Sequence, residues 1–331
     1  MSQIVKSYRG YKAVILGADF FTQGGAWRSI YAYCRQQELA GEPIHMVNLR
    51  GSRNVRQFLA AAAFAPRVIV NAFSAMGQWR VILMCLLRPD VFIYLHETQH
   101  FLDFFQRTNP LKYRLIRRIF RRNPILCVSE QAAEHYRSRF QARRTIVVYE
   151  CPGEQSRPEF DHSNKHIVMV GSIDERKGAE LFSRVADLAA ANHLAWQFHW
   201  VGGVSTLNKL ALSERVQWHG WQWEPREFVR RADLFFLSSV DDPCPLAALE
   251  ALFEQRRCVA YRRTGIAELI EGIGGCAVFE DYTPEASLAG LAKALAADLD
   301  TAALKCLAEQ KIGLQAFCAQ IDKALGGALR A

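Results

Sequence analysis

The sequence predicts two doubly wound α/β domains in tandem, and three observations carry this prediction. The chain has 331 residues, which at about 150 residues per domain corresponds to two domains. Short, continuous apolar runs alternate with longer amphipathic segments, as in parallel sheets that are covered by helices on both faces. The alternation stops once, around Cys151-Pro152-Gly153, and then resumes.

The first half contains six apolar runs that we expect to be strands. They are Lys12–Gly17, Ile44–Leu49, Arg67–Asn71, Val91–Leu95, Ile125–Ser129 and Thr145–Tyr149. Amphipathic stretches at 26–40, 77–87, 103–122 and 130–140 fit helices between them. Two prolines and a glycine in the segment 151–158 are typical of a linker. The first domain is therefore expected to span residues 1–155.

The second half repeats the alternation, and we expect its domain to span residues 160–313. Its strand candidates are His166–Val170, Phe198–Val201, Leu234–Leu237, Cys258–Tyr261 and Ala277–Phe279. Helices fit at 178–192, 226–232, 245–256 and 284–298. Ligands of open parallel sheets bind beyond the carboxyl ends of the strands. The loops that follow the strands are therefore the places to look for a site.

The composition is that of an ordinary globular protein, with 50% hydrophobic and 22% charged residues. It excludes disordered, collagenous and disulfide-scaffold proteins. No apolar stretch approaches the roughly 18 residues of a membrane-spanning helix, and the first ten residues have no signal-peptide core. Nine cysteines without a C-x-x-C pair are typical of reduced thiols. We expect a soluble cytoplasmic protein.

The charge is distributed unevenly. Residues 1–160 contain 23 Lys and Arg against 11 Asp and Glu, a net charge of +12, and residues 161–331 contain 18 against 22, a net charge of −4. This asymmetry indicates an anionic partner for the first half, such as a membrane surface, a nucleic acid or a phosphorylated substrate. An uneven but solvated surface is the alternative.

Two glycines, Gly24 and Gly25, stand between the first strand and the next helix. Glycines in this position let backbone amides approach a phosphate or a sugar, although a simple turn is the plainer explanation. The pattern is not G-x-G-x-x-G, so a dinucleotide-binding fold is not supported.

The segment Gly171-Ser172-Ile173-Asp174-Glu175-Arg176-Lys177-Gly178 follows the first strand of the second half and begins a helix. A lysine beside a glycine at a helix start can neutralise a phosphate that also accepts N–H bonds from the helix. The spacing does not match a P-loop.

A second polar segment, Ser238 to Glu250, follows the strand Leu234–Leu237. Pro245 suits the first turn of a helix, whose free amides near Leu246 and Ala247 would point toward a ligand. Asp242 and Glu250 bracket this turn, and carboxylates of this kind can accept pairs of hydrogen bonds from sugar hydroxyls. Taken alone, Glu250 is better explained as an exposed helix residue.

Three motifs in this order resemble glycosyltransferase family 4, the retaining nucleotide-sugar transferases of bacterial surface-glycan type. They are the Gly171…Lys177-Gly178 loop, Asp242-x7-Glu250 in place of the family's paired glutamates, and Thr264-Gly265-Ile266-Ala267-Glu268, which is similar to its Gly-Ile-Pro-Glu loop. The first half agrees more weakly, through Gly24-Gly25, His96, Val128-Ser129-Glu130 and Val148-Tyr149. Two departures are Asp242, which is one methylene shorter, and Ser172, where the family often has an arginine. Arg176 is a candidate to supply that charge.

The resemblance implies a GT-B fold, in which two Rossmann-like domains face each other across a cleft and the last helix, about 314–331, packs back on the first domain. It implies retaining transfer of a sugar from a nucleoside diphosphate to an acceptor hydroxyl, without a metal or other cofactor. Lipopolysaccharide or capsule assembly is the expected setting. Glu250 would bind the ribose and Asp242 the donor sugar, and His96 would lie beside the reacting sugar. Lys177, Arg176, the helix amides and the Gly24-Gly25 turn would stabilise the departing diphosphate.

The segment His96-Glu97-Thr98-Gln99-His100 also matches the zinc motif H-E-x-x-H. That chemistry needs both histidines on one helix face, whereas His96 follows a predicted strand. Zinc hydrolysis is therefore a minor alternative, beside a packing role for the histidine. A glycoside hydrolase built on Asp242 and Glu250 is weaker still, because it needs no phosphate loop. A non-catalytic nucleotide-sugar-binding subunit remains a further alternative.

Residues 109–122 contain the densest cluster of positive charge. Leu111, Leu115 and Ile119 repeat every four residues, as do Ile116 and Phe120, and we expect all five to form one apolar stripe. With the cations around it, this stripe is typical of a helix that lies on an anionic membrane. A core-packed helix with a solvated basic face is the alternative, and no RNA-binding motif accompanies the charge. Asp298-Leu299-Asp300 spells D-x-D within an expected helical stretch, and we interpret it as surface.

Overall fold

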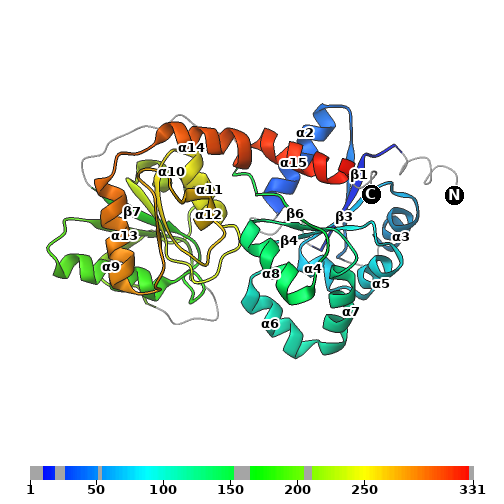
Figure 1. Cartoon of the computed structure of the whole chain (residues 1–331), viewed down its shortest axis with the longest axis horizontal. Helices are drawn as coiled ribbons and strands as arrows, with labels where there is room; N and C mark the ends of the chain where they lie inside the picture. Colours follow the sequence, from blue (N-terminus) through cyan, green and yellow to red (C-terminus); the bar gives the residue numbers. More distant parts are fainter. Residues whose placement is uncertain (1–9, 19–26, 51–53, 153–164, 205–210, 328–331) are drawn as a thin grey trace. The chain divides into compact units, whose positions relative to one another are not determined.

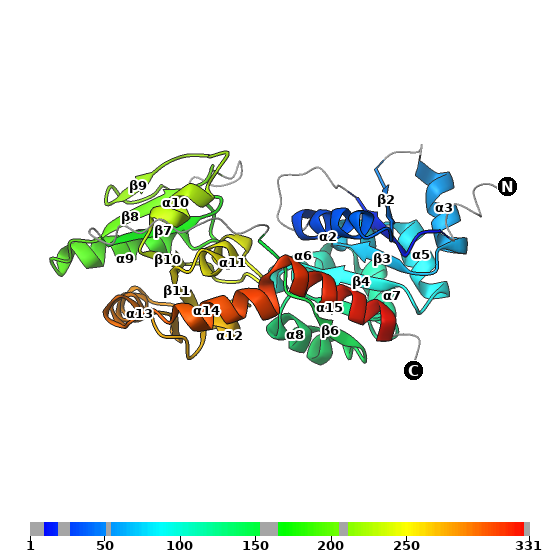
Figure 2. The same ribbon diagram turned by 90° about the horizontal axis from the view of Figure 1, so that it is seen from above.

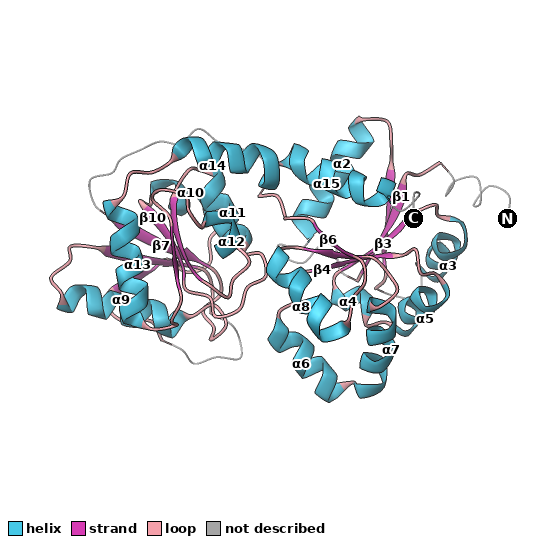
Figure 3. Cartoon of the chain, viewed as in Figure 1, coloured by secondary structure: helices cyan, strands magenta, loops and turns pink. Residues whose placement is uncertain are grey.

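The computed structural model describes residues 10–18, 27–50, 54–152, 165–204 and 211–327. The chain separates into two compact units. The first unit contains the described residues up to 152 together with 314–327, and the second contains residues 165–313. Each unit is a six-stranded sheet with helices on both faces, as Figures 1 and 3 show.

The first unit is built on a parallel sheet of order β2-β1-β3-β4-β5-β6. Helices α2 and α15 cover one face, and α3, α5, α7 and α8 cover the other (Figures 1 and 2). The strands are β1 Ala13–Gly17, β2 Ile44–Asn48, β3 Val68–Asn71, β4 Phe92–Leu95, β5 Ile125–Cys127 and β6 Thr145–Val147. The helices are α2 Arg28–Leu39, α3 Val55–Phe64, α4 Phe73–Met76, α5 Trp79–Leu87, α6 Gln99–Thr108, α7 Pro110–Phe120, α8 Glu130–Phe140 and α15 Leu314–Gly327.

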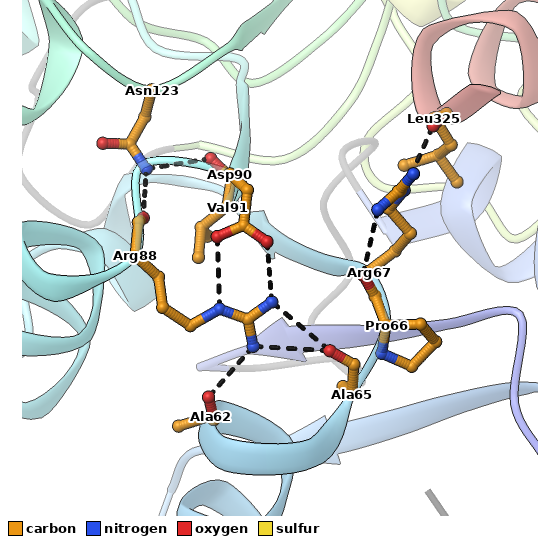
Figure 4. A network of polar contacts seen from close by, with 9 residues as sticks. All are labelled: Ala62, Ala65, Pro66, Arg67, Arg88, Asp90, Val91, Asn123 and Leu325. Carbon is orange, nitrogen blue, oxygen red and sulfur yellow. Dashed lines mark hydrogen bonds and ion pairs between the residues drawn. The ribbon is translucent and has the colours of Figure 1, made fainter. Parts of the chain in front are cut away.

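Helix α15 is fastened to the first unit by polar contacts. The carboxylate of Asp322 accepts a hydrogen bond from the Tyr33 hydroxyl at 2.6 Å and lies 2.9 Å from Lys12 Nζ. Arg67 Nε donates to the carbonyl of Leu325 at 3.1 Å (Figure 4). The end of the chain therefore belongs to the unit in which the chain begins.

The second unit is also built on a parallel sheet, of order β12-β11-β10-β7-β8-β9. Its strands are β7 His166–Val170, β8 Gln197–Val201, β9 Val216–Trp218, β10 Leu234–Leu237, β11 Arg257–Tyr261 and β12 Ala277–Phe279. Its helices are α9 Ala179–Ala191, α10 Arg226–Arg231, α11 Leu246–Phe253, α12 Ala267–Ile270, α13 Pro284–Ala296 and α14 Thr301–Leu307, followed by a π-helical turn over Ala308–Ile312.

The expected strands are confirmed with shifts of one or two residues at their ends, but the expected helix over 103–122 is wrong. Two helices, α6 and α7, occupy this stretch and are separated at Asn109. Pro110 is the cause, because it lacks an N–H and its ring blocks a continuous helix, whereas it fits the first position of a new one.

The apolar stripe expected on α7 is confirmed in part. Leu111 is 62% exposed, and the buried residues are Ile116, Ile119 and Phe120. Of the five residues expected in the stripe, the three nearest the C-terminal end of α7 are therefore the ones that pack inside the first unit.

Asp298 and Asp300 lie between two helices rather than within one, because α13 ends at Ala296. Asp300 accepts a hydrogen bond from the backbone N–H of Ala303 at 2.9 Å and thereby caps α14. Both aspartates are exposed, as expected for a surface D-x-D.

Three histidines form a row across the strands β7, β8 and β9. His166 Nδ1 lies 2.8 Å from His199 Nε2, and His199 Nδ1 lies 3.1 Å from His219 Nε2. Burial, with smaller contributions from the two neighbouring histidines, lowers the pKa of His199 to about 4. The central imidazole is therefore neutral at pH 7 and can donate to one neighbour while accepting from the other.

Among the residues that the structure describes, none of the helices has the length and apolar character needed to cross a membrane.

Candidate functional site

The sheet order of the second unit brings the predicted loops together. Strands β10, β7, β8 and β9 are consecutive neighbours in a parallel sheet. The loops that follow them therefore lie in a row along one edge, about 4.8 Å apart. From the loop after β10 to the loop after β9 the row extends for about 14 Å.

Asp174 organises the loop after β7. Its Oδ1 accepts the backbone N–H of Lys177 at 2.7 Å, and its Oδ2 accepts the hydroxyl of Ser172 at 2.6 Å. Such a turn holds the chain in place before α9 begins. Ser172 thus stabilises the loop itself, and the site's positive charge comes from the residues that follow.

Lys177 and Asp242 form an ion pair across the loops after β7 and β10. Lys177 Nζ lies 2.5 Å from Asp242 Oδ2, and the two side chains are 16% and 9% exposed. Arg176 Nη1 approaches the same oxygen at 3.4 Å and is 38% exposed. Two cations thus share one carboxylate oxygen in a partly buried place.

The backbone contact beside this ion pair requires a glycine. Gly178 has φ +72°, and a Cβ on it would lie 1.9 Å from the carbonyl oxygen of Ser238. Ser238 Oγ donates to the Lys177 carbonyl at 2.9 Å, and Tyr282 Oη donates to the Ser238 carbonyl at 2.6 Å. Burial raises the pKa of Tyr282, which keeps its hydroxyl a donor at neutral pH.

Helix α11 begins at Leu246, four residues after Asp242. Pro245 is its N-cap, and the N–H groups of Ala248 and Leu249 donate to the Pro245 carbonyl. The N–H groups of Leu246 and Ala247 come before these donors, so helix geometry gives them no intrahelical acceptor. The start of α11 thus supplies free amides and the positive end of the helix dipole beside the two cations.

The remaining motifs of the second unit lie next to this helix start. Glu250 is buried in α11, with 7% of its surface exposed. The N–H of Gly265, in the loop after β11, donates to the Asp242 carbonyl at 2.9 Å. Gly171 lies under Lys177, because a Cβ on it would be 3.3 Å from Lys177 Cδ. The three motifs that the sequence singled out in this half are therefore neighbours in space.

The sequence reasoning missed an aromatic cluster at the other end of the row. Trp218, Trp221 and Trp223 at and after the end of β9 are 52%, 48% and 81% exposed. The rings of Trp221 and Trp223 form an edge-to-face pair with centroids 4.5 Å apart. A Cβ on Gly203, which follows β8, would lie 3.7 Å from Trp221 Cβ. Three tryptophans within six residues were the available signal.

In the first unit, His96 follows β4 and is held on both sides. Its Nε2 lies 3.0 Å from Asn71 Oδ1, and its Nδ1 lies 2.7 Å from Glu150 Oε1. The side chains of His96 and Glu150 are 11% and 4% exposed. The imidazole is therefore fixed by two neighbours, one at the end of β3 and one in the segment after β6. Sequence reasoning identified neither of them.

The residues of the H-E-x-x-H match do not share a helix. His96 precedes α6, and Thr98 caps this helix by accepting the N–H of Phe101. Glu97 accepts N–H bonds from Phe73 and from His96, and burial raises its pKa. His100 is exposed in the first turn of α6. A zinc site of this type needs both histidines one turn apart on a helix, so the match is coincidental.

Two predicted residues, Gly24 and Gly25, lie outside the described residues. Within the described part of the chain, no group of three or more His, Cys, Asp and Glu side chains is arranged to hold a metal ion.

Comparison with protein families gives one match. Residues 164–298 match the family model described as Glycosyl transferases group 1. This stretch is less than half of the chain, and it contains the Lys177–Asp242 pair and α11. A search of curated protein sequences finds no match.

Solved structures agree with the fold. HepE from Anabaena, in complex with UDP, is similar at a TM-score of 0.71 and 15% identity, over 96% of this chain and 100% of that one. WaaG, a glycosyltransferase involved in lipopolysaccharide biosynthesis, is similar at a TM-score of 0.65 and 13% identity. The match covers 95% of this chain and 100% of WaaG. A TarM variant from S. aureus, in complex with Fondaparinux, alpha-GlcNAc-glycerol and UDP, is similar at a TM-score of 0.61 and 16% identity. The match covers 78% of this chain but only 55% of the TarM chain. The GT-B fold, with two Rossmann-like units, is thereby confirmed.

Replacing Gly178 by alanine tests the close approach of the loops after β7 and β10. Gly272 is a matched control, because it also has positive φ (+83°) and a Cβ there meets none of the described atoms within 4 Å. We expect Gly272→Ala to cost about 1 to 2 kcal/mol for its backbone conformation alone. Gly178→Ala should cost at least about 1 kcal/mol more for the forced separation of the loops. Urea unfolding of both variants, monitored by tryptophan fluorescence, measures the difference. Equal unfolding midpoints would contradict the close contact.

Proposed function

We propose that this protein is a retaining, metal-independent glycosyltransferase of family 4 that moves a sugar from a nucleoside-diphosphate donor to an acceptor hydroxyl. The observation that carries the proposal is the cluster of Lys177, Arg176 and Asp242 beside the start of α11. It lies within the stretch that matches the glycosyltransferase model. The UDP-bound structures of similar fold support a nucleotide donor.

The first role is stabilisation of the leaving diphosphate. Negative charge builds on the diphosphate as its bond to the sugar breaks, and preorganised cations and amides lower the energy of that state. Lys177 and Arg176 supply two positive charges, and the N–H groups of Leu246 and Ala247 supply donors. Without ligand, Lys177 is partly neutralised by Asp242. A bound diphosphate competes with that carboxylate for the lysine.

Carboxylates take the hydroxyl-binding roles in this proposal. Asp242 binds the donor sugar beside the diphosphate, and Glu250 binds the ribose. His96 lies beside the reacting sugar in this proposal, with its imidazole held by Asn71 and Glu150. The acceptor attacks from the face that the diphosphate leaves, with the departing phosphate taking its proton.

The tryptophans after β9 are a surface for the nucleobase. Exposed aromatic rings at one end of this row of loops can stack a base while Lys177 and Arg176, in the loop after β7, hold its phosphates. Trp221 is the better candidate of the pair, because it lies against Gly203 and so next to the loop after β8. This assignment extends the site along the whole edge from β10 to β9.

The acceptor in this proposal is a glycan or a lipid-linked precursor in surface-glycan assembly, such as lipopolysaccharide or capsule. WaaG, of similar fold, is a glycosyltransferase involved in lipopolysaccharide biosynthesis. The corresponding location is the cytoplasm, on the inner face of the cytoplasmic membrane.

The variants Lys177→Ala and Asp242→Asn separate the diphosphate-binding role of the lysine from the sugar-binding role of the aspartate. We expect Lys177→Ala to lower turnover by at least about tenfold, or 1.4 kcal/mol, and to weaken binding of the nucleoside diphosphate. Asp242→Asn should also lower turnover, but it should tighten diphosphate binding, since it removes a negative charge and releases Lys177. Donor hydrolysis without acceptor and calorimetric titration of the diphosphate measure the two effects.

Arg184→Ala is the control, because Arg184 is an exposed cation on the neighbouring helix α9. It should leave both quantities unchanged. Near-normal turnover of Lys177→Ala would remove the phosphate role. Diphosphate binding without any donor hydrolysis or transfer by the wild type would favour the binding-subunit alternative.

Trp221→Ala tests the nucleobase surface. Loss of stacking should weaken a nucleoside diphosphate by about tenfold but leave inorganic pyrophosphate, which has no base, unaffected. Trp79→Ala removes a comparably exposed tryptophan of the first unit and should change neither affinity. Parallel loss of pyrophosphate binding in Trp221→Ala would show that the tryptophan acts on the loops rather than on the base.

A further inference from the structure

Helix α5 presents a second apolar stripe to solvent. Trp79, Leu83 and Leu87, spaced by four residues, are 52%, 59% and 74% exposed. The opposite side of the same helix is buried through Val81, Ile82, Met84 and Cys85. A surface helix normally buries its one apolar stripe and exposes polar residues. Helix α5 therefore has an apolar side that this chain leaves open.

Neighbouring helices enlarge this apolar surface. Val55, Leu59 and Phe64 of α3 are 41%, 58% and 42% exposed, and Leu111 of α7 is 62% exposed. We call these residues the α5 face: Val55, Leu59, Phe64, Trp79, Leu83, Leu87 and Leu111. Exposed apolar patches of this extent mark interaction sites on soluble proteins.

Helices α3, α5 and α7 lie on the same face of the sheet (Figures 1 and 2), and polar contacts join them. Lys112 Nζ of α7 donates to the Gly77 carbonyl at 2.9 Å and stands 5.3 Å from the ring centre of Trp79. At the other end of α5, Arg88 Nη1 donates to the Ala62 carbonyl of α3 at 2.9 Å (Figure 4). Residues of the α5 face thus come from three helices that are joined to one another in the first unit.

The charge of these helices has one sign. Helices α3, α5 and α7 contain no Asp or Glu but six basic residues: Arg56, Arg80, Lys112, Arg114, Arg117 and Arg118. Four of these, Arg56, Arg114, Arg117 and Arg118, are exposed. The acidic residue that follows α5, Asp90, is bound by Arg88 at 2.8 Å. An apolar surface edged by cations is complementary to a layer that is apolar inside and anionic outside.

We propose that the α5 face docks this protein on an anionic phospholipid membrane. Trp79, Leu83 and Leu87 enter the boundary between headgroups and acyl chains, where tryptophan is favoured. Arginines of α7 pair with the lipid phosphates, each favoured by the negative surface potential. Helix α7 thus supplies the charge, and α5 supplies most of the apolar groups, which the sequence pattern had assigned to α7 alone.

Vesicle sedimentation tests the proposal with the whole protein. We expect binding to mixed phosphatidylcholine–phosphatidylglycerol vesicles, none to phosphatidylcholine alone, and loss of binding at high salt, which screens the attraction. Leu83→Ser with Leu87→Ser should raise the lipid concentration for half-binding by at least about tenfold. Arg117→Gln with Arg118→Gln should raise it by about tenfold as well, because two charges that pair with lipid phosphates are lost.

Matched controls come from α2, on the opposite face of the sheet. Leu39 is 76% exposed and Arg35 is exposed, so Leu39→Ser and Arg35→Gln make the same chemical changes elsewhere on the first unit. Both should bind vesicles as the wild type does. All replaced side chains are exposed, so the melting temperatures should stay unchanged.

Three outcomes would overturn the proposal. They are equal binding to neutral and anionic vesicles, unchanged binding by the α5 variants, and no binding at all. A concentration-dependent dimer that Leu83→Ser dissolves, without vesicle binding, would assign the face to a second copy of the chain instead. The readout needs no sugar donor, so it can succeed or fail independently of the transferase proposal.

Discussion

The contact between the loops after β7 and β10 is the constraint on which the rest of the site depends. Because the two strands are parallel neighbours, their loops leave the sheet at the same edge. Gly178 lets the backbones approach closely enough for Ser238 and Tyr282 to join them by hydrogen bonds. That approach brings Lys177 to Asp242 and places both beside the start of α11.

A partly buried ion pair of this kind is weak evidence for stability, because desolvation offsets much of the attraction. Its value here is that it keeps a lysine desolvated and pointed at one place. An anion that enters finds Lys177, Arg176 and the amides of α11 already arranged, so little reorganisation is needed at the moment of reaction. The acidic partner keeps the site from carrying two unpaired positive charges when no ligand is present.

The sequence predicted well those features that depend on local patterns. Buried parallel strands are short apolar runs, which is why eleven of the twelve described strands were expected. The exception, β9, exposes Gln217 and Trp218 and so lacks that pattern. With β9 the tryptophan cluster was missed as well. Contacts such as Lys177–Asp242 and His96–Glu150 join residues more than fifty positions apart. These contacts follow from the order of the strands in the sheet, which periodicity does not reveal. The order of motifs along the chain nevertheless predicted that the loops after β7 and β10 belong to one site.

Thermal stability with UDP, GDP, ADP, CDP and dTDP, each with excess EDTA, tests the central claim most directly. At about 100 times its dissociation constant, a ligand that binds only the folded protein adds about 2.7 kcal/mol of stability. The account predicts that one diphosphate raises the melting temperature in EDTA and that Lys177→Ala abolishes the rise. No stabilisation by any diphosphate, or a rise that depends on a metal ion, would contradict it.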